Sequence, residues 1–343
     1  MMPEQDIQWK DKTVWQAWVA KYQRSDVTRS VWQIANSLGP YLLLWYGMYR
    51  SLEYSYWLTL ALSIPAAGFL VRIFIILHDC GHGSFFRSRR VNDVVGWIAG
   101  VLTFTPYREW RHRHAIHHAS GSNLDKRGVG DVWMLTVNEY LQGSRAWRFK
   151  YRVFRNPAVL LGVGPLLMFL ILHRLASSTS GPREKRSVYS TNLALAVLVA
   201  VMSFIVGVWS FVLVMLPTIW VASIAGVWLF YVQHQFEGTY WARGKSWDFY
   251  LAAMKGSSFY RLPGILRWFS GNIGYHHIHH LSPRIPNYFL RRCHLETPAF
   301  HQVKPVSFVS SLRSLALRLW DEERQRLVGF ADVKARKEVP LPL

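Results

Sequence analysis

Cysteine and acidic side chains are scarce in this chain of 343 residues. The two cysteines, Cys80 and Cys293, are too few for a disulfide framework or a cysteine-based zinc site, and we expect Cys80 to be a small buried residue. Against 20 Asp and Glu residues stand 40 Lys and Arg, which gives a formal net charge of +20. Residues 1–30 contain no apolar signal-peptide core, so we expect the N-terminus to stay in the cytoplasm.

Charged residues make up 17% of the chain, whereas 51% is hydrophobic and 17 residues are Trp. Several apolar runs approach the roughly 20 residues that cross a bilayer as a helix. The composition predicts an integral membrane protein with a single domain over 1–343, divided into an N-terminal interfacial segment (1–30), a histidine-rich core (31–300) and a C-terminal part (301–343). The basic excess then lies beside the spans on the cytoplasmic side and contacts anionic lipid headgroups, so we predict no nucleic-acid partner.

The apolar runs predict an all-α fold with four transmembrane helices. The first two spans cover residues 31–49 and 56–77, and two more fit into residues 188–232. Residues 94–106 are too short to cross. Residues 157–172 have basic residues on both flanks, so the positive-inside rule favours an interfacial or half-inserted helix there. This count also keeps three clusters of histidines on one side of the membrane.

Two amphipathic segments are expected outside the bilayer. Residues 7–24 predict a helix that either lies at the membrane interface or packs on the protein. Residues 308–327 repeat apolar residues among charged ones, which predicts a cytoplasmic helix. Arg72 falls inside the second span and is expected to reach toward the cytoplasmic side, because an unpaired charge within the bilayer is costly.

Histidines gather at the ends of the apolar runs. An H-x-x-x-H pattern is followed by two H-x-x-H-H patterns, and one more histidine stands where the last span ends: His78 and His82; His114, His117 and His118; His276, His279 and His280; and His234. On a helix, residues at i, i+3 and i+4 share a face. A face of neutral imidazoles suits Fe, Zn, Cu or Ni.

Eight or nine imidazoles exceed what one tetrahedral zinc ion uses, so they predict two metal ions with four to five ligands each. Redox-active iron with an open coordination position fits best if the substrate needs oxygen chemistry. The near-absence of carboxylates among the candidates separates this site from the Glu/His di-iron sites of soluble helix bundles.

Other polar residues near these patterns are candidates for supporting roles. The carboxylates that could orient the imidazoles are Asp79, Glu109, Asp131 and Glu237. Five histidines are left outside the predicted site: His112, His173, His277, His294 and His301. The first and third of these point away from the shared faces, and the others are single histidines, which are more often hydrogen-bonded core residues than ligands.

The three histidine patterns and their flanks resemble those of the membrane fatty acid desaturases, in particular the acyl-lipid Δ12/ω6 and bacterial Δ5 types. The first is His78-Asp-Cys-Gly-His82-Gly-Ser-Phe-Phe, and the second runs from Trp110 to His118. The third, Asn272-Ile-Gly-Tyr-His276-His-Ile-His279-His280-Leu-Ser-Pro-Arg-Ile-Pro-Asn-Tyr288, is the most similar. Gln233-His234-Gln-Phe-Glu237 resembles the extra histidine of the family. The likeness covers roughly residues 30–300.

The resemblance implies four transmembrane helices, interfacial helices and a cytoplasmic helical cap that holds a di-iron centre. The iron ligands it implies are His78, His82, His114, His117, His118, His234, His276, His279 and His280. It also implies a reaction in which O2 and two electrons insert a double bond into a fatty acyl chain, in a bacterial inner membrane with the site on the cytoplasmic side. Phe230 stands where acyl-CoA desaturases have an asparagine that binds iron through water, which puts that contact in doubt.

The partners expected from this comparison are a fatty acyl lipid or thioester, membrane lipids and a separate electron carrier. The chain has no haem-binding His-Pro-Gly-Gly segment, and an acidic ferredoxin would suit its basic cytoplasmic face. An apolar tunnel would hold the acyl chain, and aromatic residues near the histidines are candidates to line it: Trp97, Trp110, Trp133, Trp228 and Tyr231.

Two alternatives remain open from the sequence. The first is a hydroxylase or ketolase with the same histidine patterns that acts on a carotenoid, an alkane or a sphingolipid. The second is a metal- or haem-binding membrane carrier, which would need ligands buried in the middle of a span rather than at its end.

Overall fold

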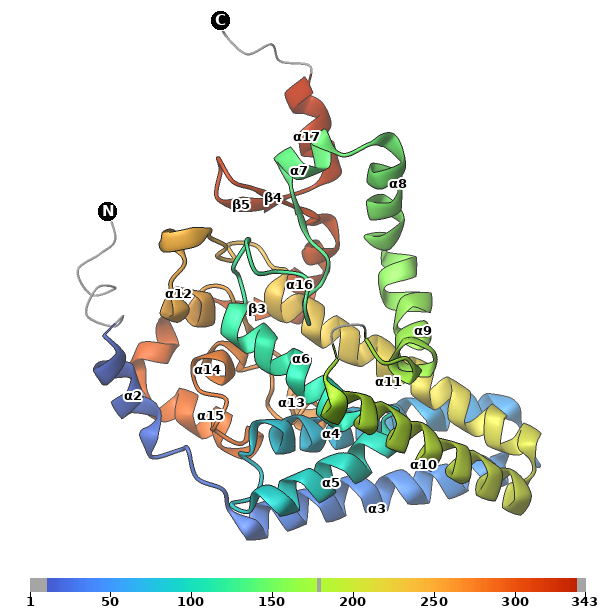
Figure 1. Ribbon diagram of the computed structural model, residues 1–343. Helices are drawn as coiled ribbons and strands as arrows, with labels where there is room; N and C mark the ends of the chain where they lie inside the picture. The colour runs from blue at the N-terminus through green and yellow to red at the C-terminus, as the bar shows by residue number, and fades with distance from the viewer. Residues whose placement is uncertain (1–10, 178–179, 338–343) are drawn as a thin grey trace, which may run out of the picture.

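The computed structural model describes residues 11–177 and 180–337, and most of them are helical (Figure 1). The longer helices are α2 (Lys12–Ala20), α3 (Val27–Ser51), α4 (Tyr56–His82), α5 (Arg89–Leu102), α6 (Tyr107–Ser120), α8 (Arg145–Phe154), α10 (Pro182–Val206), α11 (Val208–His234), α15 (Asn287–Glu296) and α17 (Phe330–Lys337). Shorter helices are α7 (Val137–Gln142), α9 (Gly164–Leu170), α12 (Phe249–Met254), α13 (Gly264–Phe269), α14 (His276–Leu281) and α16 (Phe308–Ser311). A short π-helix is η1 (Ala158–Val163), and short 3-10 helices are η2 (Leu172–Arg174), η3 (Gly244–Ser246), η4 (Pro298–Gln302) and η5 (Leu312–Ala316).

Among the described residues, three helices are long and apolar enough to cross a membrane: α4, α10 and α11. The second predicted span is confirmed as α4. The run over 188–232 is confirmed as two helices, which separate at Gly207, where φ is +86°. A fourth candidate is a bent pair, Arg145–Phe154 and Ala158–Arg174, whose two parts meet at 55° as a broken span or a re-entrant loop. This pair contains the segment expected to be half-inserted.

The first predicted span corresponds to α3, a helix of 25 residues that runs beside α4 (Figure 1). Its small polar residues face inward: Ser30 and Ser37 are fully buried, and the Ser30 hydroxyl donates to the Phe85 carbonyl over 2.6 Å. Large apolar residues such as Trp32 and Leu43 face outward and are more than half exposed. Apolar residues outside and small polar residues against a neighbouring helix are typical of helices in lipid.

Helix α5 packs along α4, and most of the remaining elements gather at one end of the long helices, where we call them the cap. Figure 1 shows α6, α12, α14 and α15 beside the ends of α4 and α11, with α7, α8 and α17 further out. Two small sheets tie the cap together, which an all-α expectation did not include. Strands β1 (Leu135–Thr136), β4 (Leu319–Asp321) and β5 (Arg326–Val328) form one, with β1 parallel to β4 and β4 antiparallel to β5. Strands β2 (Phe259–Arg261) and β3 (Pro305–Ser307) pair in parallel.

The helix expected over 308–327 is wrong. The structure has the short helices α16 and η5 there, followed by the β4–β5 hairpin. All three residues of β4 are buried, and the Asp321 carboxylate accepts hydrogen bonds from the backbone N–H groups of Glu323 and Arg324, both over 3.1 Å, which closes the turn. Pairing with β1 and burial of β4 therefore override the helical spacing of the leucines.

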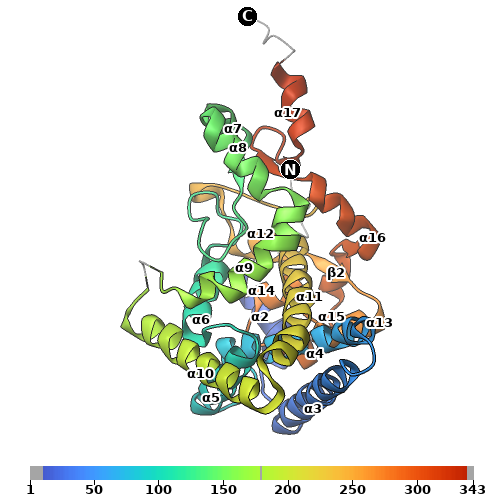
Figure 2. The same ribbon diagram turned by 90° about the vertical axis from the view of Figure 1, so that its right-hand side faces the viewer.

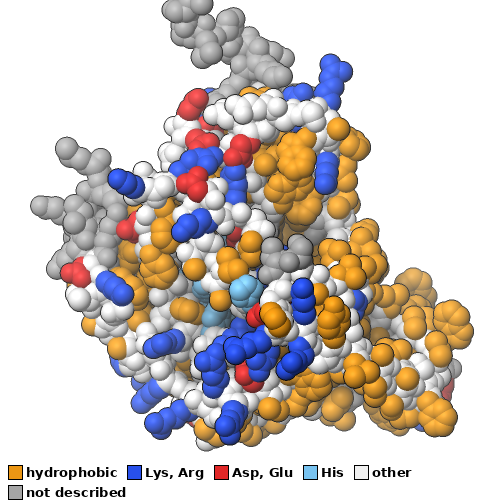
Figure 3. Space-filling view, viewed as in Figure 1, with side chains coloured by type: hydrophobic (Ala, Val, Ile, Leu, Met, Phe, Trp, Pro, Cys, Tyr) orange, Lys and Arg blue, Asp and Glu red, His pale blue; other side chains and the backbone are white. Residues whose placement is uncertain are grey.

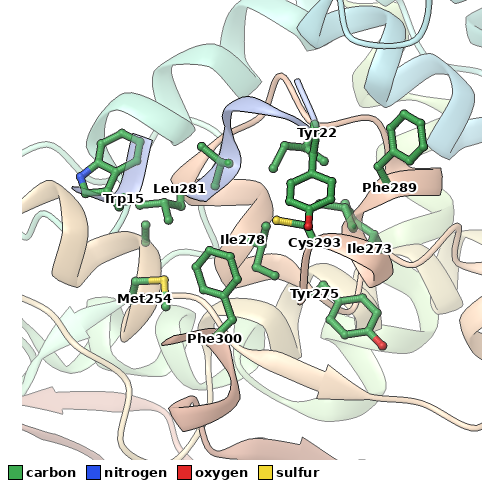
Figure 4. Packing of buried hydrophobic residues seen from close by; sticks show 14 of the residues in the cluster. Trp15, Tyr22, Met254, Ile273, Tyr275, Ile278, Leu281, Phe289, Cys293 and Phe300 are labelled. Carbon is green, nitrogen blue, oxygen red and sulfur yellow. The ribbon is translucent and has the colours of Figure 1, made fainter. Parts of the chain in front are cut away.

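The expected N-terminal amphipathic helix is present as the shorter α2, and residues 7–10 of the predicted segment lie outside the described residues. Trp15 and Val19 are buried against the cap rather than turned outward. Figure 4 shows Trp15 and Tyr22 in one apolar cluster with Ile278 and Cys293. Of the two expectations, packing on the protein is the one observed.

Candidate metal centre

The nine histidines singled out in the sequence come together from four helices. Helix α4 carries His78 and His82 in its last two turns, and His234 is the last residue of α11. Helices α6 and α14 carry the two H-x-x-H-H patterns. The ends of two membrane-type helices thus meet two helices of the cap.

Two groups of ring nitrogens could each hold a metal ion, and in each group the candidate ligand atoms all lie within 4.8 Å of one another. What we call the outer group consists of His78, His82, His114, His118 and His279. What we call the inner group consists of His117, His234, His276 and His280. Every member of the inner group is buried, whereas three members of the outer group are only partly buried.

The two H-x-x-H-H helices share their histidines between the groups in a reciprocal way. Helix α6 gives its i, i+4 pair, His114 and His118, to the outer group and His117 to the inner group. Helix α14 gives its i, i+4 pair, His276 and His280, to the inner group and His279 to the outer group. The groups are therefore neighbours, and the His118 and His280 rings stack with their centroids 4.1 Å apart.

The spacing between ring nitrogens fits metal coordination. Five Nε2–Nε2 pairs are 3.0–3.1 Å apart, two in the outer group and three in the inner group. With metal–nitrogen bonds of about 2.1 Å, ligands at 90° are separated by about 3.0 Å and tetrahedral ligands by about 3.4 Å. The observed distances are therefore of the size expected for nitrogens that share one metal ion.

Each group contains one histidine that is oriented by a carboxylate. His78 Nδ1 lies 3.0 Å from Asp79 Oδ1, and His117 Nδ1 lies 2.5 Å from Asp131 Oδ1. Because a carboxylate only accepts, each Nδ1 carries the proton and the Nε2 lone pair faces the group, as a metal ligand requires. Two of the four candidate carboxylates thus contact a histidine of the site.

Asp79 also connects the outer group to the end of the third histidine pattern. Its Oδ2 accepts hydrogen bonds from the Asn287 backbone N–H over 2.7 Å and from Asn287 Nδ2 over 2.8 Å. Sequence reasoning missed this role of Asn287, although the residue belongs to the segment that resembles the family. The sequence offered one signal for this role, which is that Asp79 stands next to a histidine with no Lys or Arg beside it. A buried carboxylate in such a position needs hydrogen-bond donors from elsewhere in the chain.

The other two candidate carboxylates have different surroundings. Glu109 is buried and accepts a hydrogen bond from the Ser180 hydroxyl over 2.8 Å, and Glu237 is exposed. His112 is exposed on α6, and His277 is buried beside Phe259 and His294. Neither histidine belongs to a group.

Aromatic residues enclose the groups and fix α6 against α4. Trp110 stacks on His114 with ring centroids 4.4 Å apart, and it would lie 3.0 Å from a Cβ placed on Gly81, so the glycine permits this close approach. The Tyr107 hydroxyl donates to the Cys80 carbonyl over 2.8 Å, and Cys80 is buried as expected. The Phe230 ring centroid lies 5.3 Å from those of both His117 and His234, so an aromatic side chain packs against the inner group.

The remaining aromatic residues proposed for a tunnel have other contacts. Trp133 packs against Tyr151, and Trp228 donates from its ring nitrogen to the Tyr260 hydroxyl over 3.2 Å. Tyr231 is buried and accepts a hydrogen bond from Arg155 over 3.1 Å. These residues hold the cap on the end of α11.

Burial favours the neutral form of five histidines on α6 and α14. Removal from water lowers their pKa well below the usual value, and repulsion from neighbouring imidazoles adds to this effect: His114, His118, His276, His279 and His280. A neutral imidazole with a free Nε2 lone pair is the form that binds a metal ion, so burial favours the metal-binding form of these five side chains.

The fold and the site define a helical membrane protein with two neighbouring histidine groups, each able to hold a metal ion. The model of the fatty acid desaturase family matches residues 55–307. A Bacillus subtilis (strain 168) protein named fatty acid desaturase is 47% identical over 342 residues, covering 100% of this chain and 96% of the relative. The chain therefore belongs to the fatty acid desaturase family and is an oxidoreductase.

More distant relatives have more specific names. The sn-1 acyl-lipid omega-3 desaturase (ferredoxin) of Synechocystis sp. is 30% identical over 68% of this chain and 64% of its own length. The sn-1 oleoyl-lipid 12-desaturase of the same organism is 28% identical over 66% of this chain and 64% of its own length.

Proposed function

We propose that the outer and inner groups each bind one iron ion and that the nine histidines are the ligands. The observation that carries this proposal is the division of the histidines into sets of five and four whose nitrogens converge. Bound iron would supply the oxidising power to remove hydrogen from an unactivated methylene with O2. The protein side chains orient the ligands through Asp79 and Asp131 and exclude water from the inner group.

The reaction proposed is desaturation of a fatty acyl chain. Two hydrogen atoms leave neighbouring methylenes, O2 is reduced to two molecules of water, and two further electrons and two protons are taken up from outside. The acyl chain is proposed to be lipid-linked, because two relatives are named as acyl-lipid and oleoyl-lipid desaturases. A thioester-linked chain is the alternative that the substrate assay below distinguishes.

The proposed topology has four spans, α3, α4, α10 and α11, with the bent pair of α8 and α9 at the interface. In this topology the C-terminal ends of α4 and α11 reach the same side of the membrane, where His82 and His234 end the two helices. The basic residues of α6 lie on this side, which the positive-inside rule makes cytoplasmic. The location proposed is the inner membrane of a bacterial cell.

An acidic one-electron carrier such as ferredoxin is the proposed donor. Arg108, Arg111 and Arg113 stand on α6 beside His114, and the first two share one carboxylate, Asp93, at 3.2 and 3.1 Å. Figure 3 shows Lys and Arg side chains gathered next to histidines at the surface. Charge complementarity would bring the carrier to the partly exposed outer group rather than to the buried inner one.

The test is gas chromatography–mass spectrometry of lipids from cells that express the chain, its His279→Ala variant and His112→Ala as a control. His112 is an exposed histidine of α6 outside both groups, so its removal leaves the ligands intact. New double bonds are expected with the unaltered chain and the control and not with His279→Ala. Fatty acids identical to those of the empty host in every case contradict the proposal, and hydroxylated or keto products favour the alternative reactions.

The acyl carrier is identified by supplying the purified protein with the same acyl chain on a phospholipid and on a thioester. Conversion of the phospholipid form is expected. Metal analysis of the same preparation is expected to find iron, whereas one haem per chain would favour a carrier protein.

A further inference from the structure

A cavity of about 510 Å³ lies on the other side of α4 from α6, between α3, α4, α13 and α15. Figure 2 shows α13 and α15 next to α4 and above α3, at the cap end of the long helices. The lining residues that matter here are Gln33, Arg72, Arg267, Trp268, Asn287 and Arg291. The cavity is open to the outside.

The lining is strongly basic. Besides Arg72, Arg267 and Arg291 it includes Arg292 and one acid, Glu296. The Glu296 carboxylate is already bound by Arg292 Nε at 2.6 Å, by Lys21 Nζ at 2.9 Å and by the Tyr22 hydroxyl at 2.7 Å. The charge of Glu296 is therefore compensated at the rim, and the remaining arginines leave the cavity positive.

Two buried side chains in the wall carry hydrogen-bond donors that have no acceptor within the described residues. Gln33 is 3% exposed and its Nε2 is unpartnered, and Arg72 is 7% exposed with an unpartnered Nε. The Arg72 Nη1 donates to the Trp268 carbonyl, and its guanidinium lies 4.0 Å from the Trp268 ring centre, which holds the side chain against α13. A buried donor without an acceptor is unfavourable, so the wall is suited to a ligand rich in acceptor oxygens.

Exposed apolar side chains stand on two of the helices that line the cavity. Leu295 on α15 lines the cavity and is 55% exposed, and Ile265 and Leu266, next to the lining residues of α13, are 69% and 41% exposed. Residues of this kind next to clustered arginines, at the end of membrane-type helices, fit a molecule with an anionic group and hydrocarbon chains. A free phosphate or a soluble nucleotide would use the arginines and leave these side chains in water.

We propose that this cavity binds the phosphate of a glycerophospholipid headgroup and thereby seats the substrate lipid beside the outer group. Arg267 and Arg291 contact the phosphate from the rim, and Gln33 and Arg72 donate from the wall. Asn287 lines the cavity and hydrogen-bonds Asp79, which orients His78, so the headgroup site and the metal centre share a wall. Only the statement that this lipid is the substrate rests on the proposed function.

The test is native mass spectrometry of the purified full chain in detergent with phosphatidylglycerol. The variant is Arg267→Ala/Arg291→Ala, which removes two rim charges and leaves the buried residues in place. The matched control, Lys304→Ala/Arg313→Ala, removes two exposed charges elsewhere in the cap. At about 1 kcal/mol per basic residue near a lipid headgroup, binding to the variant is expected to weaken roughly 10- to 30-fold and binding to the control to stay unchanged.

Competition by coenzyme A and by inorganic phosphate identifies the source of the phosphate. Neither is expected to displace phosphatidylglycerol at millimolar concentration. Displacement by either one, or equal binding by the variant, the control and the unaltered chain, would overturn the proposal. With phosphatidylglycerol as the acyl donor, KM is expected to rise more than kcat falls in the variant; an unaltered chain that binds this lipid without desaturating it would contradict the proposed function and leave the headgroup site intact.

Discussion

Replacement of Asp79 by Asn tests the link between the carboxylate and the outer group. Asp79 is 1% exposed and accepts three hydrogen bonds, one from His78 Nδ1 and two from Asn287. An amide has one accepting oxygen, so Asp79→Asn leaves either His78 or Asn287 facing a second donor. The substitution preserves the size of the side chain, which isolates the effect of charge and hydrogen bonding.

The expected loss follows from these contacts. A hydrogen bond to a charged group contributes about 1.5–3 kcal/mol, and changing a residue that orients a metal-binding histidine lowers metal affinity about 10- to 100-fold. If the substitution changes the tautomer of His78 so that Nε2 carries the proton, that nitrogen can no longer bind a metal. We therefore expect iron affinity at the outer group to fall by about one to two orders of magnitude and desaturation to fall with it.

The measurement is titration of the metal-free protein with Fe(II), with iron content determined by mass spectrometry and helicity by circular dichroism. Asp93→Asn is the control, because Asp93 lies near the outer group but pairs with Arg108 and Arg111 instead of a histidine. Loss of the outer iron in Asp79→Asn, with helicity and the control unaffected, is the expected result. Two irons bound with unaltered affinity in Asp79→Asn would refute the role assigned to the carboxylate.

Three further predictions concern the inner group, the backbone and pH. Asp131→Asn removes the partner of His117 and is expected to lower iron affinity at the inner group about 10- to 100-fold, leaving one tightly bound iron per chain in the same titration. Gly271→Ala is expected to destabilise the protein by about 1–3 kcal/mol in chemical unfolding, because φ is +54° and the new Cβ would lie 2.7 Å from Ile75 Cγ2; unaltered stability would contradict this. Burial lowers the pKa of His294 to about 4, so between pH 6.5 and pH 4 this side chain takes up a proton in the unfolded chain and not in the folded one. The contribution of His294 to stability is therefore complete above pH 6.5 and is lost as the pH falls toward 4. Thermal melts of the metal-free His294→Phe variant are expected to show a weaker loss of stability over this range.

The sequence predicted the membrane-type helices and singled out the nine histidines that the structure brings together, because both signals are local. Twenty or more apolar residues define α4 and α11 without reference to the rest of the chain, and the i, i+4 spacing places His114 and His118 on one face. The division between the groups was not predictable from spacing. His117 shares a helical face with His114 and His118, and only the placement of α6 beside the end of α11 and beside α14 assigns it to the inner group.

The prediction of a helix over 308–327 failed for the same physical reason. The spacing of Leu312, Leu315 and Leu319 fits one long helix as well as it fits the observed η5 and β4. The sequence does not reveal which strand pairs with β4. That partner is β1, where Leu135 lies opposite Leu319 in the register. A contact between distant segments decided the structure, and local periodicity carried no information about it.

The two histidine groups differ in what surrounds them, and this asymmetry indicates at which group the electron carrier and the substrate would arrive. The outer group is partly exposed beside the arginines of α6, and through Asp79 and Asn287 it shares a wall with the basic cavity on the other side of α4. The inner group is fully buried and has Phe230 against two of its rings. If an acidic carrier and a lipid phosphate occupy the two basic surfaces, both approach the outer group from opposite sides of one helix. Electrons and substrate would then arrive at the same metal position, and the buried inner position would be shielded from solvent during the reaction.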